Sequence, residues 1–204
     1  MDPTTFATAY ALSTSIGLRP FLTLAIAALA IHFGYLHVSP AFAFLGSDGT
    51  AWLFGGLALL EFLGDKIPAV DHVLHVLHFG VKPIAAAILV GGAVGTAADP
   101  NDAMTYVAMG AAGLNALGIH TGVTALRGAS SAMTLGVANP VLSLVEDVVT
   151  VGATLLALVA PFVGAALALA IGVFVLVVLY VLIRELRKRR SVAAVRSMSA
   201  PPAA

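Results

Sequence analysis

Long apolar segments follow one another along nearly the whole chain, separated by short breaks that contain proline, glycine or aspartate. Of the 204 residues, 60% are hydrophobic and only 10% are charged. A soluble domain carries about 25% charged residues, so too few charges remain here to cover a globule in water. A bilayer can solvate such a chain, because an apolar stretch of about 20 residues crosses it as a helix. The composition therefore predicts an all-helical, polytopic membrane protein whose main partner is the lipid bilayer.

The apolar segments predict about six transmembrane helices, at about residues 5–34, 50–64, 83–98, 103–126, 140–160 and 161–183. The first segment contains Arg19-Pro20, where proline predicts a kink or a break of the helix. Residues 70–79 are expected to form a separate amphipathic helix at the membrane interface. Because the segments at 50–64 and 83–98 are short, four spans with re-entrant hairpins are the main alternative.

Basic residues predict the orientation of these helices. Six of them follow the last apolar segment, namely Arg184, Arg187, Lys188, Arg189, Arg190 and Arg196. Because cytoplasmic loops are enriched in Lys and Arg, we interpret this tail as a topology anchor and expect no nucleic-acid partner. We expect both termini, with Lys66, Lys82 and Arg127, on the cytoplasmic side of a bacterial inner membrane. The prediction is a single transmembrane domain over residues 1–190 and a disordered cytoplasmic tail over 191–204.

Similar landmarks recur in the two halves of the chain, at about residues 5–98 and 103–183. Each half begins with a helix that carries a Leu-Arg pair, at 18–19 and at 126–127. Each continues with a helix that carries acidic residues and ends with a proline followed by small residues. Three helices per half is an odd number, so the second half would be inverted in the membrane. Inverted repeats of this kind are typical of secondary transporters.

Four acidic residues lie in or beside apolar segments, namely Glu61, Asp65, Glu146 and Asp147. A charged side chain at the bilayer centre costs at least about 2.5–3.5 kcal/mol, so such a residue usually has a partner or a function. We therefore expect a substrate or ion site made by these four residues at the interface of the two halves. A structural network of paired charges is the alternative. The expected charge partners are Arg19, Lys66, Arg127 and His120.

A run of Asp and His near residue 70 is a weak candidate for a metal site, with Asp71, His72 and His75 as ligands. Three histidines spaced three residues apart spread over about 120° of a helix, so all three cannot easily share one ion. The cofactor cannot be assigned. The chain contains no Walker loop, dinucleotide fingerprint or zincin motif. We therefore expect no enzymatic activity.

Several of these motifs occur together in a recognisable order. They are Gly17-Leu18-Arg19, then Glu61 with Asp65-Lys66-Ile67-Pro68 and Asp71, then Pro83, His120 and Arg127, then Ser143-Leu144-x-Glu146-Asp147. In this order the chain resembles domain-of-unknown-function family 4126, a family of small bacterial and plant membrane proteins. The resemblance implies an integral membrane protein and no known activity. It implies the shared polar residues Arg19, Glu61, Asp65, Lys66, Asp71, Arg127, Glu146 and Asp147.

The leading functional hypothesis is a small transporter or permease that is coupled to a proton or another ion. The alternative is a non-catalytic accessory or assembly subunit of a larger membrane complex, and a homodimer is possible in either case. A membrane-embedded enzyme that uses the carboxylates as acid and base on a lipid is a weaker third hypothesis. A wet cavity between the two acid-bearing helices favours transport, and a dry, fully paired cluster favours a structural role.

Overall fold

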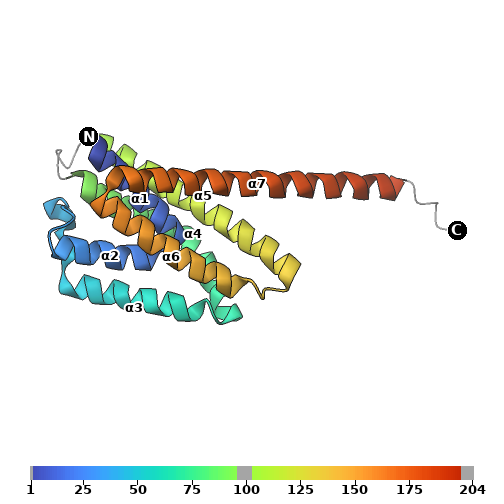
Figure 1. Ribbon diagram of the computed structural model, residues 1–204, viewed down its shortest axis with the longest axis horizontal. Coiled ribbons are helices and arrows are strands. Elements are labelled where there is room, and N and C mark those ends of the chain that lie inside the picture. Colours follow the sequence, from blue (N-terminus) through green and yellow to red (C-terminus); the bar gives the residue numbers. More distant parts are fainter. Residues whose placement is uncertain (1, 96–102, 199–204) are drawn as a thin grey trace.

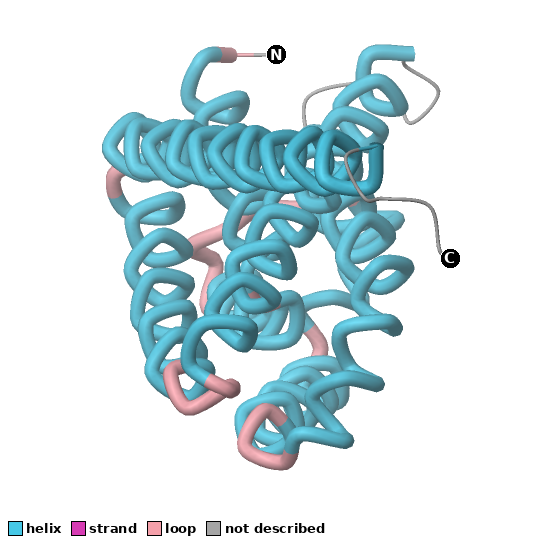
Figure 2. Tube along the Cα trace, turned by 90° about the vertical axis from the view of Figure 1, so that its right-hand side faces the viewer, coloured by secondary structure: helices cyan, strands magenta, loops and turns pink. Residues whose placement is uncertain are grey.

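The computed structural model describes residues 2–95 and 103–198, without the side chains of residues 68, 69, 71, 72, 186 and 189–198. Within these ranges every secondary-structure element is a helix, which confirms the predicted all-helical class (Figure 2). In chain order the elements are α1 (Pro3–Leu18), α2 (Pro20–His32), the 3-10 helix η1 (Pro40–Gly46), α3 (Asp48–Gly64), α4 (Pro68–Val94), α5 (Ala103–Thr134), α6 (Asn139–Val159) and α7 (Pro161–Met198).

The first predicted segment is broken at Arg19, as Pro20 indicates. Arg19 has extended backbone angles, φ −131° and ψ 97°, between the end of α1 and the start of α2. The start of α1 lies beside the end of α6, where the Thr8 hydroxyl donates to the Ala157 carbonyl at 3.3 Å. The segment after α2 returns to the same end of the bundle, where Ser39 N–H donates to the Gly92 carbonyl near the end of α4. Helices α1 and α2 therefore form a hairpin with Arg19 at its tip (Figure 1).

This hairpin changes the predicted topology. We call the end of the bundle that holds residues 2–8 and 33–39 the N-terminal edge, and the end that holds residues 65–67 and 135–138 the far edge. Helices α3 to α7 run alternately between the two edges, and α7 projects beyond the far edge (Figure 1). The expectation of both termini on one side assumed that residues 5–34 cross the membrane once. In the structure this segment forms a hairpin, because the break at Arg19 reverses the direction of the chain.

Two other boundaries differ from the prediction. Helix α4 is continuous and contains Pro83, so the separate interfacial helix expected at 70–79 is the first part of α4. Proline removes one backbone donor, and an apolar helix tolerates this where neighbouring groups satisfy the freed carbonyl. Helix α7 continues to Met198, so helix occupies positions 191–198, where the sequence predicts a disordered tail. Alanine, arginine and methionine in this stretch all favour helix.

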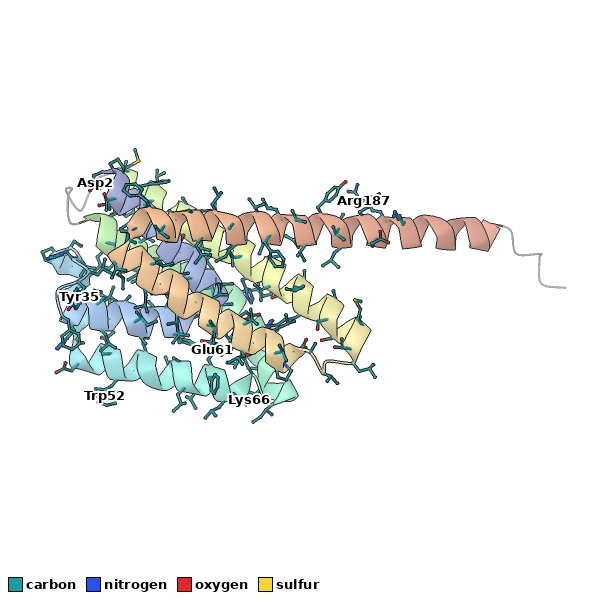
Figure 3. The ribbon with its side chains drawn as sticks, in the orientation of Figure 1. Asp2, Tyr35, Trp52, Glu61, Lys66 and Arg187 are labelled. Atoms are coloured by element: carbon teal, nitrogen blue, oxygen red, sulfur yellow. The ribbon has the colours of Figure 1, made fainter. Side chains whose placement is uncertain are left out.

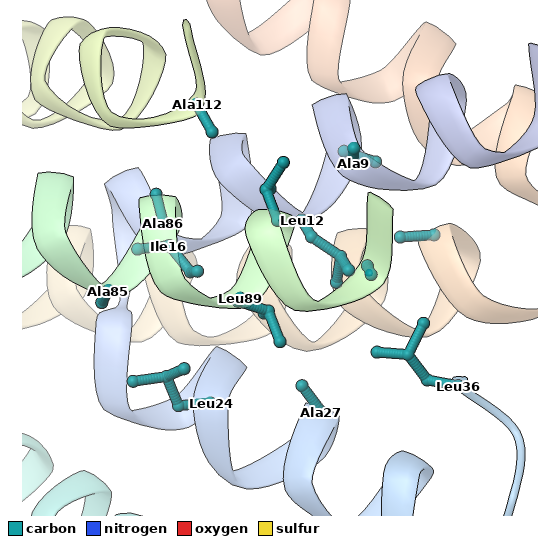
Figure 4. Packing of buried hydrophobic residues seen from close by; sticks show 14 of the residues in the cluster. Ala9, Leu12, Ile16, Leu24, Ala27, Leu36, Ala85, Ala86, Leu89 and Ala112 are labelled. Atoms are coloured by element: carbon teal, nitrogen blue, oxygen red, sulfur yellow. The ribbon is translucent and has the colours of Figure 1, made fainter. Parts of the chain in front are cut away.

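Small side chains form much of the core between the helices. Leu12 and Ile16 of α1 pack against Ala86 and Leu89 of α4, and Ala27 of α2 lies beside them (Figure 4). Gly17 has no room for a side chain, because an added Cβ would lie 2.6 Å from the Ile119 Cβ of α5. Close helix contacts of this kind are typical of membrane proteins, in which small residues let backbones approach.

Many large apolar side chains point outward, which is the expected pattern for a surface in lipid. Examples are Trp52 at 83% exposure, Leu60 at 64% and Leu176 at 66%. Within the described residues, three helical segments are long and apolar enough to cross a membrane, namely Val73–Val94, Asn139–Val159 and Pro161–Glu185. A fourth is possible if η1 and α3, which are bent by 56°, count as one span. The fold therefore supports an integral membrane protein.

Candidate functional site

Arg19, at the tip of the α1–α2 hairpin, is the centre of a buried charge cluster. Only 3% of the residue is exposed. Its Nη1 forms an ion pair with Asp65 Oδ2, and its Nε lies 2.8 Å from Asp147 Oδ1. Its Nη2 donates to the Ser143 hydroxyl and to the Ser143 carbonyl. The broken helix thus presents a guanidinium group to α3 on one side and to α6 on the other.

A second arginine, Arg127 of α5, contacts Glu146 and Asp65. Arg127 Nε donates to Glu146 Oε1 at 3.0 Å, and Arg127 Nη2 donates to Glu146 Oε2 at 2.7 Å. This bidentate geometry is the strongest arrangement of an arginine with a carboxylate. Arg127 Nη2 also lies 3.6 Å from Asp65 Oδ2, which accepts a hydrogen bond from the Ser143 hydroxyl at 2.8 Å. Asp65 therefore links Arg19, Arg127 and Ser143.

Glu61 is the least satisfied member of the cluster. The residue is 2% exposed, yet neither carboxylate oxygen accepts a hydrogen bond from any group that the structure describes. Its Oε1 lies 3.7 Å from Arg19 Nη1 and 3.5 Å from His78 Nε2. A buried carboxylate without hydrogen bonds is strongly disfavoured, so binding of a proton or another cation to Glu61 is favourable.

The charges of the cluster do not balance. Among the described side chains, four carboxylates face the two guanidinium groups of Arg19 and Arg127. The nearby Lys82 contacts backbone carbonyls and His120 and makes no ion pair with these carboxylates in the described structure. Even with Lys82 included, one negative charge is left over. A proton or a monovalent cation would neutralise it.

A cavity of about 300 Å³ adjoins the unsatisfied side of the cluster. Its polar lining comes from Arg19, Glu61 and Asp147, and its apolar lining comes from Leu22, Ala58, Leu59 and Phe62. Asp147 Oδ2, like the Glu61 oxygens, accepts no hydrogen bond from the described groups. The cavity therefore lies beside two carboxylates whose unsatisfied oxygens are buried. The cluster is not fully paired.

Most of the predicted site residues meet in this cluster. The structure brings together Glu61, Asp65, Glu146 and Asp147 with the predicted partners Arg19 and Arg127. Lys66 does not join them. Its Nζ lies 3.2 Å from the centre of the Phe62 ring and donates to the Phe62 carbonyl, so it extends along the outer surface of α3 near the far edge (Figure 3). No ion pair between Lys66 and the cluster occurs among the described contacts, because its long side chain can extend away from the core.

The predicted metal site at Asp71, His72 and His75 stays a prediction. The side chains of Asp71 and His72 lie outside the described part of the chain. No group of three or more His, Asp or Glu side chains that could hold a metal occurs among the described residues. His75 instead lies beside His120, whose Nε2 is 3.2 Å from the His75 carbonyl.

Two buried residues of the site were missed in the sequence. Lys82, predicted in a cytoplasmic loop, is 3% exposed, and its Nζ donates to the Gly17 and Leu18 carbonyls at 3.0 and 2.8 Å. These carbonyls are left without helical partners where α1 ends, and a cation is favourable at a helix C-terminus. His78 is also 3% exposed and faces Glu61. In the sequence, the signal for a buried Lys82 is its place within an otherwise apolar run.

Comparison with protein families supports the resemblance of the motifs. The family model described as a domain of unknown function, DUF4126, matches residues 6–182, which include the whole charge cluster. The chain belongs to the DUF4126 family. Comparison with curated proteins and with solved structures gives no match. The DUF4126 assignment carries no activity, so the chemistry of the cluster has to be argued from its geometry.

Proposed function

We propose that this DUF4126 protein is a small membrane transporter that is coupled to a proton or another monovalent cation. The observation that carries the proposal is Glu61, a buried carboxylate beside a cavity, with no hydrogen bond from the described groups. Ionisable groups held within a transmembrane bundle are typically parts of ion or proton pathways. A purely structural network would pair each carboxylate, as Arg127 pairs Glu146.

The position of the cluster also supports transport. Arg19 and Ser143 link the hairpin tip to α6, and Asp65 links the end of α3 to both. Glu146 lies about 10 Å along α6 from Asn139, so the cluster lies inside the bundle and not at a rim. A charge that enters the cavity changes the attraction between the hairpin, α3 and α6. Binding there can therefore shift the hairpin relative to α3 and α6.

The experiment measures flux in vesicles that contain the purified protein. A pH-sensitive dye inside the vesicles reports proton movement when a proton gradient is imposed, and parallel vesicles carry a Na⁺ or K⁺ gradient. The proposal expects flux above that of empty vesicles under at least one gradient. Folded protein that gives no flux under any of the gradients would overturn it. The alternative hypothesis, an accessory subunit of a larger complex, would then be tested by gentle solubilisation and mass spectrometry. Recovery of a hetero-complex would support it.

We further propose a topology with five crossings, by α3 to α7, and a re-entrant hairpin that enters from the N-terminal edge. Helices α3 and α6 run in opposite directions, as an inverted repeat requires, while the hairpin has no counterpart in the single long helix α5. The basic end of α7 favours a cytoplasmic far edge of a bacterial inner membrane.

The absence of native cysteine allows a clean test of this topology. Single cysteines at position 2 and at position 196 should be labelled by a membrane-impermeant thiol reagent from opposite sides of the membrane. Labelling of both from the same side would support an even number of crossings and contradict the proposed hairpin.

A further inference from the structure

A group of buried imidazoles lies next to Glu61. His78 of α4 contacts Glu61 through its Nε2, and the Phe21 ring of α2 covers it at a centroid distance of 6.0 Å. His120 of α5 is fully buried, and its ring centre lies 6.0 Å from that of His78. His75, one turn nearer the far edge on α4, is partly buried and lies 5.7 Å from His120. The three imidazoles therefore lie together beside Glu61, and His78 is the one that contacts it.

Lys82 determines which nitrogen of His120 carries a proton. Its ammonium donates to the carbonyls of Gly17 and Leu18, and its third contact is His120 Nδ1 at 3.0 Å. Because an ammonium group is a donor, Nδ1 of His120 must be the acceptor. The proton of neutral His120 then lies on Nε2, which donates to the His75 carbonyl at 3.2 Å. Lys82 is thus a positioning residue that holds His120 beside the other two rings.

We propose that His78 delivers protons to Glu61, its contact at 3.5 Å. This inference rests on the proposed function and specifies the coupling ion as a proton. In the transfer step, the N–H bond at Nε2 of protonated His78 breaks and an O–H bond forms at Glu61 Oε1. The products are a neutral imidazole and a carboxylic acid, so charge and atoms balance. The cavity beside Glu61 and Asp147 is the place where the proton leaves or a substrate enters.

The surroundings of Glu61 favour a proton over a metal cation. Nitrogen groups approach the carboxylate from two sides, Arg19 at the hairpin tip and His78 on α4. Hard cations instead require several oxygen ligands and are repelled by a guanidinium group. The charged and titratable groups around Glu61 are Arg19 from the hairpin, Asp65 on its own helix, His78 and Lys82 from α4, and Glu146 and Asp147 from α6.

The test measures proton uptake by purified protein in detergent after a rapid pH change, with a pH dye in solution. His78→Phe keeps an aromatic ring and removes the proton carrier, and His78→Gln keeps polarity should the phenylalanine variant not fold. Glu61→Gln should lack one phase of proton uptake, which identifies that phase as uptake by Glu61. We expect either His78 variant to slow this phase by about a hundredfold. His37→Phe changes an exposed histidine outside the cluster and should leave this phase unchanged. An unchanged phase in folded His78 variants would overturn the relay.

This measurement separates the relay from transport itself, because uptake in detergent needs no flux. If vesicles show flux and the His78 variants keep it coupled to the proton gradient, the relay is wrong and the transporter stands. If uptake depends on His78 while vesicles show no flux under any gradient, the relay stands and the transport proposal fails.

Discussion

Replacing Arg19 with alanine is expected to destabilise the protein by about 3–5 kcal/mol, because the change breaks a buried ion-pair network by removing one partner. The guanidinium group lies between α3 and α6 and contacts Asp65, Asp147 and Ser143. Without it, carboxylates on two helices face each other across a buried space. Arg19→Lys should recover only part of the loss, since an ammonium cannot reproduce the fork of donors.

Reversible unfolding in mixed micelles with a denaturing detergent measures this effect. Arg184→Ala is the matched control, since Arg184 is exposed on α7 outside the cluster and its loss should change stability by less than about 0.5 kcal/mol. Adding Asp65→Asn to Arg19→Ala should return part of the lost stability, because the two residues interact directly. If Arg19→Ala is no more destabilising than the Arg184 control, the cluster does not hold the hairpin in place.

Replacing Glu61 with glutamine is expected to abolish gradient-driven flux, with a decrease of about a hundredfold or more, while stability stays the same or increases. The reason is the charge balance of the cluster. Glutamine keeps the shape of the side chain and removes the excess negative charge. A residue with only a structural role would show the opposite pattern, in which loss of its charge lowers stability and flux together.

The control for this variant is Glu185→Gln. Glu185 is exposed on α7 and pairs with Lys188 at 3.0 Å, so its loss should leave flux unchanged. Glu146→Gln is a useful contrast, because Glu146 is held bidentately by Arg127 and its change should lower stability as well as flux. Full flux in folded Glu61→Gln would remove Glu61 from the transport site.

The sequence predicted the break at Arg19 and the meeting of the acids because both have local causes. Proline at position 20 disfavours helix at the preceding residue whatever the fold. Charges in apolar helices turn inward and pair wherever partners exist. The angle at the break is not local, however. It depends on the packing of α2 against α3 and of α1 against α5, as the contact between Gly17 and Ile119 shows. The reversal of the chain could therefore not be read from residues 17–20.

The different positions of Lys66 and Lys82 have a physical explanation. Both are lysines close to a proline, and the sequence alone gives both the same assignment. Lys66 follows the end of α3 and can reach outward along Phe62. Lys82 is inside α4, where the free carbonyls at the end of α1 provide acceptors. Those acceptors come from residues more than sixty positions away, so only the fold distinguishes the two lysines.

The most direct test of the account is an infrared difference spectrum between neutral and acidic pH, recorded on wild type and on Glu61→Gln. The account predicts a band from a protonated buried carboxylic acid that grows on acidification in wild type and is missing in Glu61→Gln. The same band at the same intensity in folded Glu61→Gln would show that Glu61 is not the group that takes up the proton, and would contradict the account.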